Sequence, residues 1–152
     1  MLGRMYDNQT CPVARALEVV GERWTILIVR DALFGTTRFD DFRANLGVAR
    51  NVLSNRLQTL VEADVLDRVV YQQRPPRYEY QLTERGRALA PVVMSLMDWG
   101  TQQLGADGPG RALTHHGCGG RAQVQVGCSR CAERLDSRQI DTRPTGRPAP
   151  DR

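Results

Sequence analysis

The stretch from residue 48 to residue 82 constrains the fold more than any other part of the chain. Residues 48–66, VARNVLSNRLQTLVEADVL, carry apolar side chains at helical spacing along one face: Leu53, Leu57, Leu60 and Val61. Residues 66–72 and 77–82 then alternate between apolar and polar side chains as strands do, and QRPP between them favours a turn. The stretch therefore predicts a helix followed by a β-hairpin.

Three more helices are predicted before this stretch. Residues 13–21 and 23–35 have apolar side chains at helical spacing, and each pattern stops at a glycine that can form a left-handed cap. In residues 36–47, Thr37 followed by Asp40 resembles a capping box, and Gly47 ends a short third helix.

A long helix is predicted after the hairpin. Thr83 is its expected N-cap, and its apolar stripe includes Leu89, Val92, Val93, Leu96, Met97 and Leu104. Pro91 lacks a backbone donor, so a kink or a late helix start is expected there. Trp24 and Trp99 fall within helical apolar patterns and are predicted to be core or interface residues.

The resulting order, helix, helix, short helix, helix, hairpin and long helix, is typical of a winged helix-turn-helix. The predicted fold class is mainly α with a small β-hairpin. This domain is assigned to residues 1–105, beginning with an extended arm over residues 1–12. A Cys/His extension is predicted at 106–135 and a disordered tail, rich in Arg, Pro and Asp, at 136–152.

Length and charge narrow the class of protein. A chain of 152 residues suits one domain with an appendage, and it contains no apolar run able to span a bilayer. We therefore expect a soluble cytoplasmic protein.

The net charge is +4, and all 21 basic residues are arginines, which favours contact with polyanions. Residues 1–110 contain no acid, base and nucleophile constellation and no glycine-rich phosphate loop, which argues against an enzyme.

The polar face of residues 48–62 carries side chains suited to base edges and phosphates: Arg50, Asn51, Ser54, Asn55 and Gln58. Arg43 and Arg56 are predicted to contact phosphates, and Arg74 and Arg77 flank two prolines at the expected tip of the hairpin. The alternative is that these are ordinary solvated side chains. Ala49 occupies the position where Ser or Thr would cap the helix, and a DNA phosphate there could satisfy the free amides.

Residues 113–131, LTHHGCGGRAQVQVGCSRC, contain both histidines and three of the four cysteines. Three cysteines and one histidine form a common tetrahedral zinc set, so this segment holds the candidate ligands: His115, His116, Cys118, Cys128 and Cys131. Structural zinc is one interpretation, and a redox pair of Cys128 and Cys131 is a second. A metal-free extension with reduced thiols is the third, and no other cofactor is expected.

Several strings together resemble the HxlR-type (DUF24) winged-helix transcription regulators, relatives of the MarR group. They are CPVARALEVVGERWTILIVRDALFGTTRFDDFRANL, LSNRLQTLVEADVLDR, PPRYEYQLTERGRALAPV and DWG, and they span residues 11–100. The resemblance implies a homodimer with its first and last helices in the interface. It also implies binding to inverted-repeat sites in promoter DNA and no enzymatic activity.

The resemblance further implies a role for Cys11 in sensing oxidants or electrophiles. Cys11 precedes Pro12, a favoured first helical residue, and Arg15 follows one turn later, so both the helix end and the arginine would favour the thiolate. The alternative for Cys11 is a small side chain that fills the dimer interface.

Two other functions stay open at this level. One is a thiol- or metal-based redox protein centred on the Cys/His segment, and the other is non-specific nucleic-acid binding. A small-molecule effector is also compatible with the sequence.

Overall fold

The computed structural model describes Tyr6, residues 11–105 and residues 110–142. Most of the predicted arm (1–5 and 7–10), the linker 106–109 and the end of the predicted tail (143–152) lie outside the described residues. The chain divides into two compact units, Met1–Ala122 and Gln123–Arg152, so the boundary falls inside the predicted Cys/His extension. Within the described ranges, no helix has the length and apolar character needed to cross a membrane.

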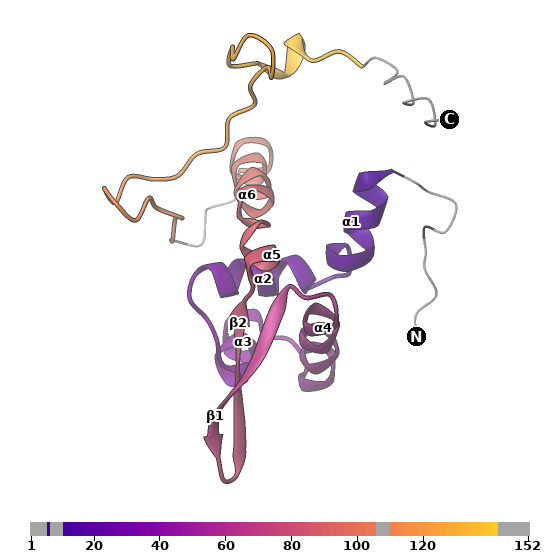
Figure 1. The fold of residues 1–152 in the computed structure, drawn as a ribbon, viewed down its shortest axis with the longest axis vertical. Coiled ribbons are helices and arrows are strands. Elements are labelled where there is room, and N and C mark those ends of the chain that lie inside the picture. The colour runs from indigo at the N-terminus through magenta and orange to yellow at the C-terminus, as the bar shows by residue number, and fades with distance from the viewer. Residues whose placement is uncertain (1–5, 7–10, 106–109, 143–152) are drawn as a thin grey trace, which may run out of the picture. The chain divides into compact units, whose positions relative to one another are not determined.

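The first unit contains six helices and one hairpin among its described residues (Figure 1). Their order is α1 (Pro12–Val20), α2 (Thr25–Leu33), α3 (Phe39–Leu46), α4 (Arg50–Glu62), β1 (Leu66–Gln73), β2 (Pro76–Leu82), α5 (Glu84–Arg87) and α6 (Ala90–Leu104). In the second unit, residues 137–139 form one 3₁₀ turn, η1. This order confirms the predicted winged helix-turn-helix fold.

The hairpin is antiparallel and is attached to the helices at its base. Leu66 pairs with Leu82, and the register shifts between Val70 and Gln72. The backbone N–H of Tyr80 donates to the carbonyl of Thr37 at 2.7 Å, next to an isolated antiparallel bridge between Arg38 and Glu79. Residues just before α3 therefore extend the two-stranded sheet, while the far end of the hairpin projects away from the helices (Figure 1).

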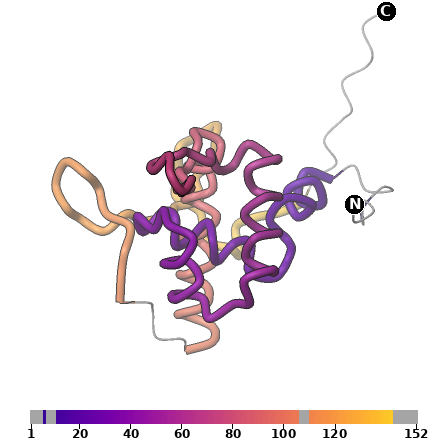
Figure 2. The backbone as a smooth tube through the Cα atoms, turned by 90° about the horizontal axis from the view of Figure 1, so that it is seen from below, coloured from indigo at the N-terminus to yellow at the C-terminus, as the bar shows by residue number. Residues whose placement is uncertain are grey.

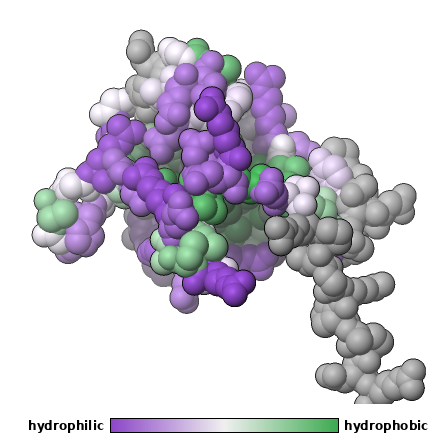
Figure 3. All heavy atoms as spheres, turned by 90° about the horizontal axis from the view of Figure 1, so that it is seen from above, coloured by the Kyte–Doolittle hydropathy of each residue, from purple (hydrophilic) through white to green (hydrophobic). Residues whose placement is uncertain are grey.

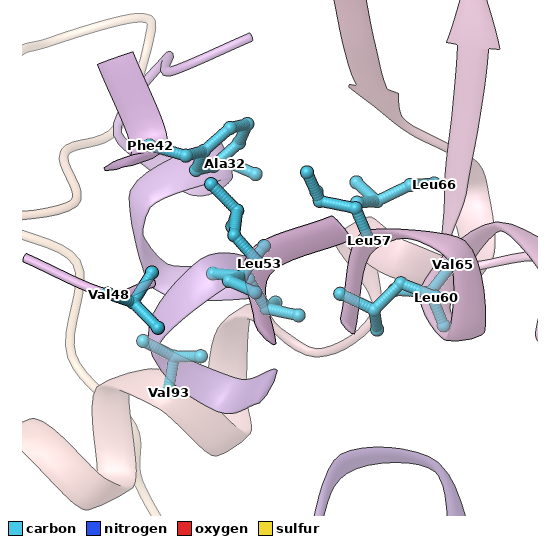
Figure 4. Packing of buried hydrophobic residues seen from close by; sticks show 11 residues of the cluster. Ala32, Phe42, Val48, Leu53, Leu57, Leu60, Val65, Leu66 and Val93 are labelled. Carbon is cyan, nitrogen blue, oxygen red and sulfur yellow. The ribbon is translucent and has the colours of Figure 1, made fainter. Parts of the chain in front are cut away.

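One apolar core joins α2, α3, α4, α6 and the base of β1 (Figure 4). Leu57 of α4 lies beside Leu66 of β1, and Val93 of α6 points toward Val48. Burial of these aliphatic side chains is the main term that stabilises the unit. The buried cluster consists of Ile28, Val29, Ala32, Phe42, Val48, Leu53, Leu57, Leu60, Val65, Leu66 and Val93.

Two predicted helix ends are wrong in detail. Gly21 follows α1 with φ −75°, in the right-handed region, so it does not form a left-handed cap. The N-cap of α3 is Arg38 in extended geometry, and its side chain makes no capping hydrogen bond. The carbonyl of Thr37 instead accepts a hydrogen bond from the N–H of Tyr80. Pairing with the hairpin therefore replaces the expected capping box. Gly47, at φ 61°, ends α3 as predicted.

The connection from the hairpin to the last helix follows the prediction closely. The hydroxyl of Thr83 accepts a hydrogen bond from the N–H of Gly86 at 3.0 Å, which caps α5. A side chain at Gly86 would collide with the carbonyl oxygen of Val65, so glycine allows this turn to pack under β1. The helix breaks after Arg87, and α6 starts late, with Pro91 in its first turn.

Candidate nucleic-acid interface

Helix α4 separates a buried face from a polar face. Leu53, Leu57 and Leu60 are fully buried in the core. The residues predicted to read DNA lie on the other side and are exposed: Arg50, Asn51, Ser54, Asn55 and Gln58. Within this set, the Gln58 amide donates to the Glu62 carboxylate at 2.9 Å. The helix thus presents hydrogen-bonding side chains along a face that packing does not use.

A shallow hollow lies at the turn between α3 and α4. It is lined by Asp40, Arg43, Ala44, Gly47, Val48, Ala49 and Arg50. Ala49 is the N-cap of α4 and provides no side-chain cap, so the first amides of the helix have no partner from that residue. Arg43 is exposed, and Arg50 lies 3.7 Å from Asp40 and over the ring of Phe39. A helix N-terminus beside two guanidinium groups is a favourable environment for a phosphate.

Arg56 differs from the other predicted contacts. Its guanidinium lies 3.1 Å from the carboxylate of Glu22 and is only 20% exposed. Its Nε atom is buried without a hydrogen-bond partner in the structure. The structure therefore places Arg56 in an ion pair between α4 and the α1–α2 turn rather than on the open polar face.

The hairpin carries more positive charge than the sequence interpretation assigned to it. Arg74 and Arg77 are exposed near its tip, as predicted. Two further exposed arginines were missed: Arg68 stacks 3.6 Å from the ring centroid of Tyr78, and Arg38 lies 5.0 Å from that of Tyr71. Sequence spacing alone gave no signal for them, because Arg68 pairs across the sheet with Tyr80 and stacks on Tyr78, while Arg38, just before α3, is bridged to Glu79.

Apolar side chains are also exposed away from the hairpin tip. On α6, Val92, Leu96 and Trp99 are 45%, 51% and 57% exposed, and on α1 Val13 and Leu17 are exposed. Both helices lie on the side of the unit opposite the hairpin tip (Figure 1), and α1 lies at the margin of the unit in the second view as well (Figure 2). In the view of Figure 3, hydrophobic residues (green) are visible at the surface among the hydrophilic ones (purple). Of the predicted α6 stripe, only Val93 is fully enclosed.

Cys11 is the N-cap of α1, and its thiol is exposed. Its carbonyl accepts the N–H of Arg15 at 3.1 Å, which begins the helix. The Arg15 guanidinium, however, contacts Glu18 at 3.1 Å. The helix end therefore lies next to the thiol as predicted, while the arginine is engaged by a carboxylate.

The candidate metal ligands form two pairs. In the first unit, Nδ1 of His115 lies 3.1 Å from Sγ of Cys118, and His116 is exposed beside them. In the second unit, hydrogen bonds from the backbone N–H groups of Cys131 and Arg130, and then from the Cys131 thiol, lower the pKa of the Cys128 thiol below its ordinary value. Among the described residues, no group of three or more potential ligands gathers around a common point.

A helix with a polar face, entered through a tight turn and followed by a basic hairpin, defines a winged helix-turn-helix DNA-binding protein. The model of the HxlR-like helix-turn-helix family matches residues 19–107. The chain belongs to this family and is a DNA-binding transcriptional regulator. The interpretation as a redox protein scaffolded by the helices gains no support from the comparisons.

Relatives and solved structures agree with this assignment. The chain is 47% identical over 133 residues to an uncharacterised HTH-type transcriptional regulator of Mycobacterium tuberculosis, Rv3095, with 87% of this chain and 84% of the relative covered. PA1607, a candidate transcription factor of known structure, superposes with a TM-score of 0.75 at 36% identity, covering 90% of this chain and 96% of its own. The reduced form of the redox regulator HypR gives a TM-score of 0.56 at 35% identity, over 62% and 96% of the two chains.

Proposed function

We propose that the protein binds promoter DNA as a homodimer, with α4 in the major groove and the β1–β2 hairpin along the flanking minor groove. The observation that carries the proposal is the division of α4 into a leucine face inside the core and a face of exposed Arg, Asn, Ser and Gln side chains. An α-helix fits the major groove, where Asn and Gln can pair with adenine and Arg with guanine.

The hollow at the start of α4 supports a specific docking position. Uncapped amides of α4, together with Arg43 and Arg50, form a binding environment for one backbone phosphate. A phosphate at this position would anchor the N-terminal end of α4, and the exposed side chains of the next two turns would then face the bases.

The hairpin supplies a second contact. Its exposed arginines project from an element that pairs with the residues before α3, so they follow the same rigid frame as α4. Arginine in a narrow minor groove gains from the enhanced negative potential there. We assign Arg74 and Arg77 to this contact, with Arg68 and Arg38 nearer the hairpin base.

The dimer is supported by exposed apolar side chains on α1 and α6. Side chains such as Leu96 and Trp99 would lose apolar area to water if a second copy covered them. Two copies also match the geometry of inverted-repeat sites, because each copy reads one half-site. We therefore propose that α1 and α6 form the interface between copies.

A sensing role is proposed for Cys11. Its thiol is exposed at the N-terminal end of α1, and α1 belongs to the proposed interface. The similarity to HypR, a redox regulator, points in the same direction. Oxidation or alkylation of Cys11 would then release DNA by altering the interface.

The polar face of α4 can be tested by replacing Asn51 and Asn55 with alanine, singly. We expect each variant to bind the promoter of its own gene about 5- to 150-fold more weakly, because a bidentate base contact contributes about 1–3 kcal/mol of discrimination. Binding to a scrambled duplex at the same salt concentration should change little. Mobility-shift titrations on both duplexes measure the two affinities.

Two controls accompany this experiment. Arg77→Ala should weaken binding to both duplexes and reduce the salt slope by about one, since it removes one arginine charge from the contact between the hairpin and the DNA. Gln102→Ala, on an exposed part of α6, should leave both affinities unchanged. Equal affinity of the wild-type protein for promoter and scrambled duplex would instead establish non-specific binding and end the proposal.

A further inference from the structure

The segment after residue 110 contains a turn stabilised by three backbone hydrogen bonds. The N–H of His115 donates to Gly120 at 2.8 Å, and the N–H of Gly119 donates back to His115 at 2.8 Å. Outside these, the N–H of Ala122 donates to Leu113 at 2.9 Å. Gly119 has φ 71°, so the chain reverses through a left-handed residue.

The second unit contains the same turn on a different sequence. The N–H of Cys128 donates to Glu133 at 2.9 Å, and the N–H of Ala132 donates back to Cys128 at 2.9 Å. The outer bond runs from the N–H of Leu135 to Val126 at 2.9 Å. Ala132 has φ 60°, at the position that Gly119 occupies in the first turn.

The two turns correspond residue by residue at one constant offset, including the isolated bridges that flank them, Thr114–Arg121 and Gly127–Arg134. The first and fourth positions are the only ones at which both turns carry a histidine or a cysteine. These are His115 and Cys118 in one turn and Cys128 and Cys131 in the other. Each copy of the turn therefore holds one pair of potential metal ligands in the same backbone geometry.

Apolar burial does not account for the structure of these turns, although Arg121, directly after the first turn, forms a 3.5 Å ion pair with Asp98 of α6. None of the residues from 113 to 135 is buried, so neither turn closes over an apolar core. Ala132 also holds a left-handed conformation that costs a non-glycine residue about 1 kcal/mol or more. Small segments without a core commonly gain their stability from a structural metal ion.

We propose that each turn is a two-ligand half-site for zinc, with His115 and Cys118 forming one and Cys128 and Cys131 the other. Zinc in structural sites takes four ligands in tetrahedral geometry, and three thiolates with one imidazole are a common set. Each ion therefore needs the ligands of two half-sites, and two half-sites per chain give an expected content of one zinc per chain, whichever copies of the half-sites pair. Each half-site supplies only two of the four ligands. This agrees with the structure, in which His115 and Cys118 lie together but no three potential ligands gather among the described residues.

The inference is independent of DNA reading, which belongs to α4 and the hairpin. The alignment with the Mycobacterium tuberculosis relative covers 133 residues and must therefore extend past residue 107. The segment is thus shared with a relative rather than being an isolated addition to this chain.

The experiment measures metal content in the full-length protein, produced without a histidine tag in zinc-supplemented medium and purified under reducing conditions. Elemental analysis should find about one zinc per chain, and less than about 0.2 would exclude a tight four-ligand site. Replacement of zinc by Co²⁺ alone should give the visible bands of tetrahedral cobalt and the near-ultraviolet absorption of thiolate ligands.

Variants then assign the ligands. Cys131→Ser and His115→Ala should each lower the zinc content at least fivefold, whereas His116→Ala, one residue outside the ligand positions, should retain it. Circular dichroism and DNA binding should stay unchanged in all three variants, because the core of the first unit contains none of these residues. These two measurements therefore distinguish loss of zinc from loss of the fold. Full zinc in His115→Ala, loss of zinc in His116→Ala, or a disulfide between Cys128 and Cys131 in place of zinc would each overturn the proposal.

Discussion

Cys11 combines exposure with a position at the end of a helix. The Arg15 guanidinium contacts Glu18, so the N-terminal end of α1 itself is the feature that adjoins the Cys11 thiol. The thiolate is the reactive species toward oxidants and electrophiles. Reaction at this point would add polar or bulky groups beside the exposed apolar side chains of α1.

Cys11→Ser should separate DNA binding from sensing. Serine is a good N-cap, so we expect normal affinity for the promoter, but no release when quinone or hypochlorite is added. Mobility-shift assays before and after treatment measure both properties. Cys11→Ala, which also lacks the thiol, serves as the second variant and should likewise stay bound to the promoter after treatment. Release of the Cys11→Ser variant at the wild-type dose would remove the sensing role.

Arg56 marks a limit of sequence interpretation at the level of single residues. The helical spacing of α4 correctly separated buried leucines from polar side chains. The partner of Arg56, however, is Glu22 in the α1–α2 turn, and this contact depends on how two distant elements pack. Arg68 and Arg38 were missed for the same reason, since their stacking on tyrosines follows from strand register.

At the scale of elements, the start of α4 is the place where stability and DNA binding compete. Ala49 has the extended backbone of an N-cap but no acceptor for the helix amides. A polar side chain there would stabilise the helix by about 1 kcal/mol, yet it would occupy the position assigned to a DNA phosphate.

The pair Ala49→Asp and Ala49→Asn tests this competition. Both variants should raise the melting temperature by several degrees, because each side chain can cap the helix. Only the aspartate should weaken DNA binding strongly, by about tenfold or more, since its charge repels the phosphate. Thermal unfolding and shift titrations provide the two measurements. Equal DNA affinities of the two variants would show that no phosphate binds at this position.

Helices and strands were predictable where local chemistry decides them. The proline in α6 delays its start, Thr83 caps α5, and the alternating residues form the hairpin, each through interactions within a few residues. The prediction that Thr37 caps α3 was wrong, because the Thr37 backbone pairs instead with Tyr80, a residue far along the chain. The paired turns of the Cys/His segment were likewise hidden, since hydrogen bonds and not residue types make them equivalent.

At the scale of the whole molecule, the proposed dimer depends on the exposed apolar stripe of α6. Val92, Leu96 and Trp99 recur at helical spacing on one side of the helix, while Val93 faces the core. A helix that is apolar on two sides needs a partner for each side. The core of the unit covers one side, and a second copy is proposed for the other.

Leu96→Glu should convert the protein to a monomer without unfolding it, because the side chain lies outside the core and is half exposed. Sedimentation velocity should show the change in mass, and circular dichroism should be unchanged. Affinity for an inverted-repeat promoter should fall at least about tenfold, since one copy reads only one half-site. Gln102→Glu, an equivalent charge elsewhere on α6, should remain dimeric; a dimeric Leu96→Glu variant would place the interface elsewhere.

The bond from Tyr80 to Thr37 has a mechanical consequence. It joins the base of the hairpin to the extended residues before α3. Helix α4 and the basic hairpin therefore belong to one stiff frame. Such a frame resists bending within each copy. In the proposed dimer, a signal arriving at α1 or α6 would therefore change the distance between the two copies of α4 rather than the shape of either copy. An operator with one base pair added between its half-sites would report that distance directly.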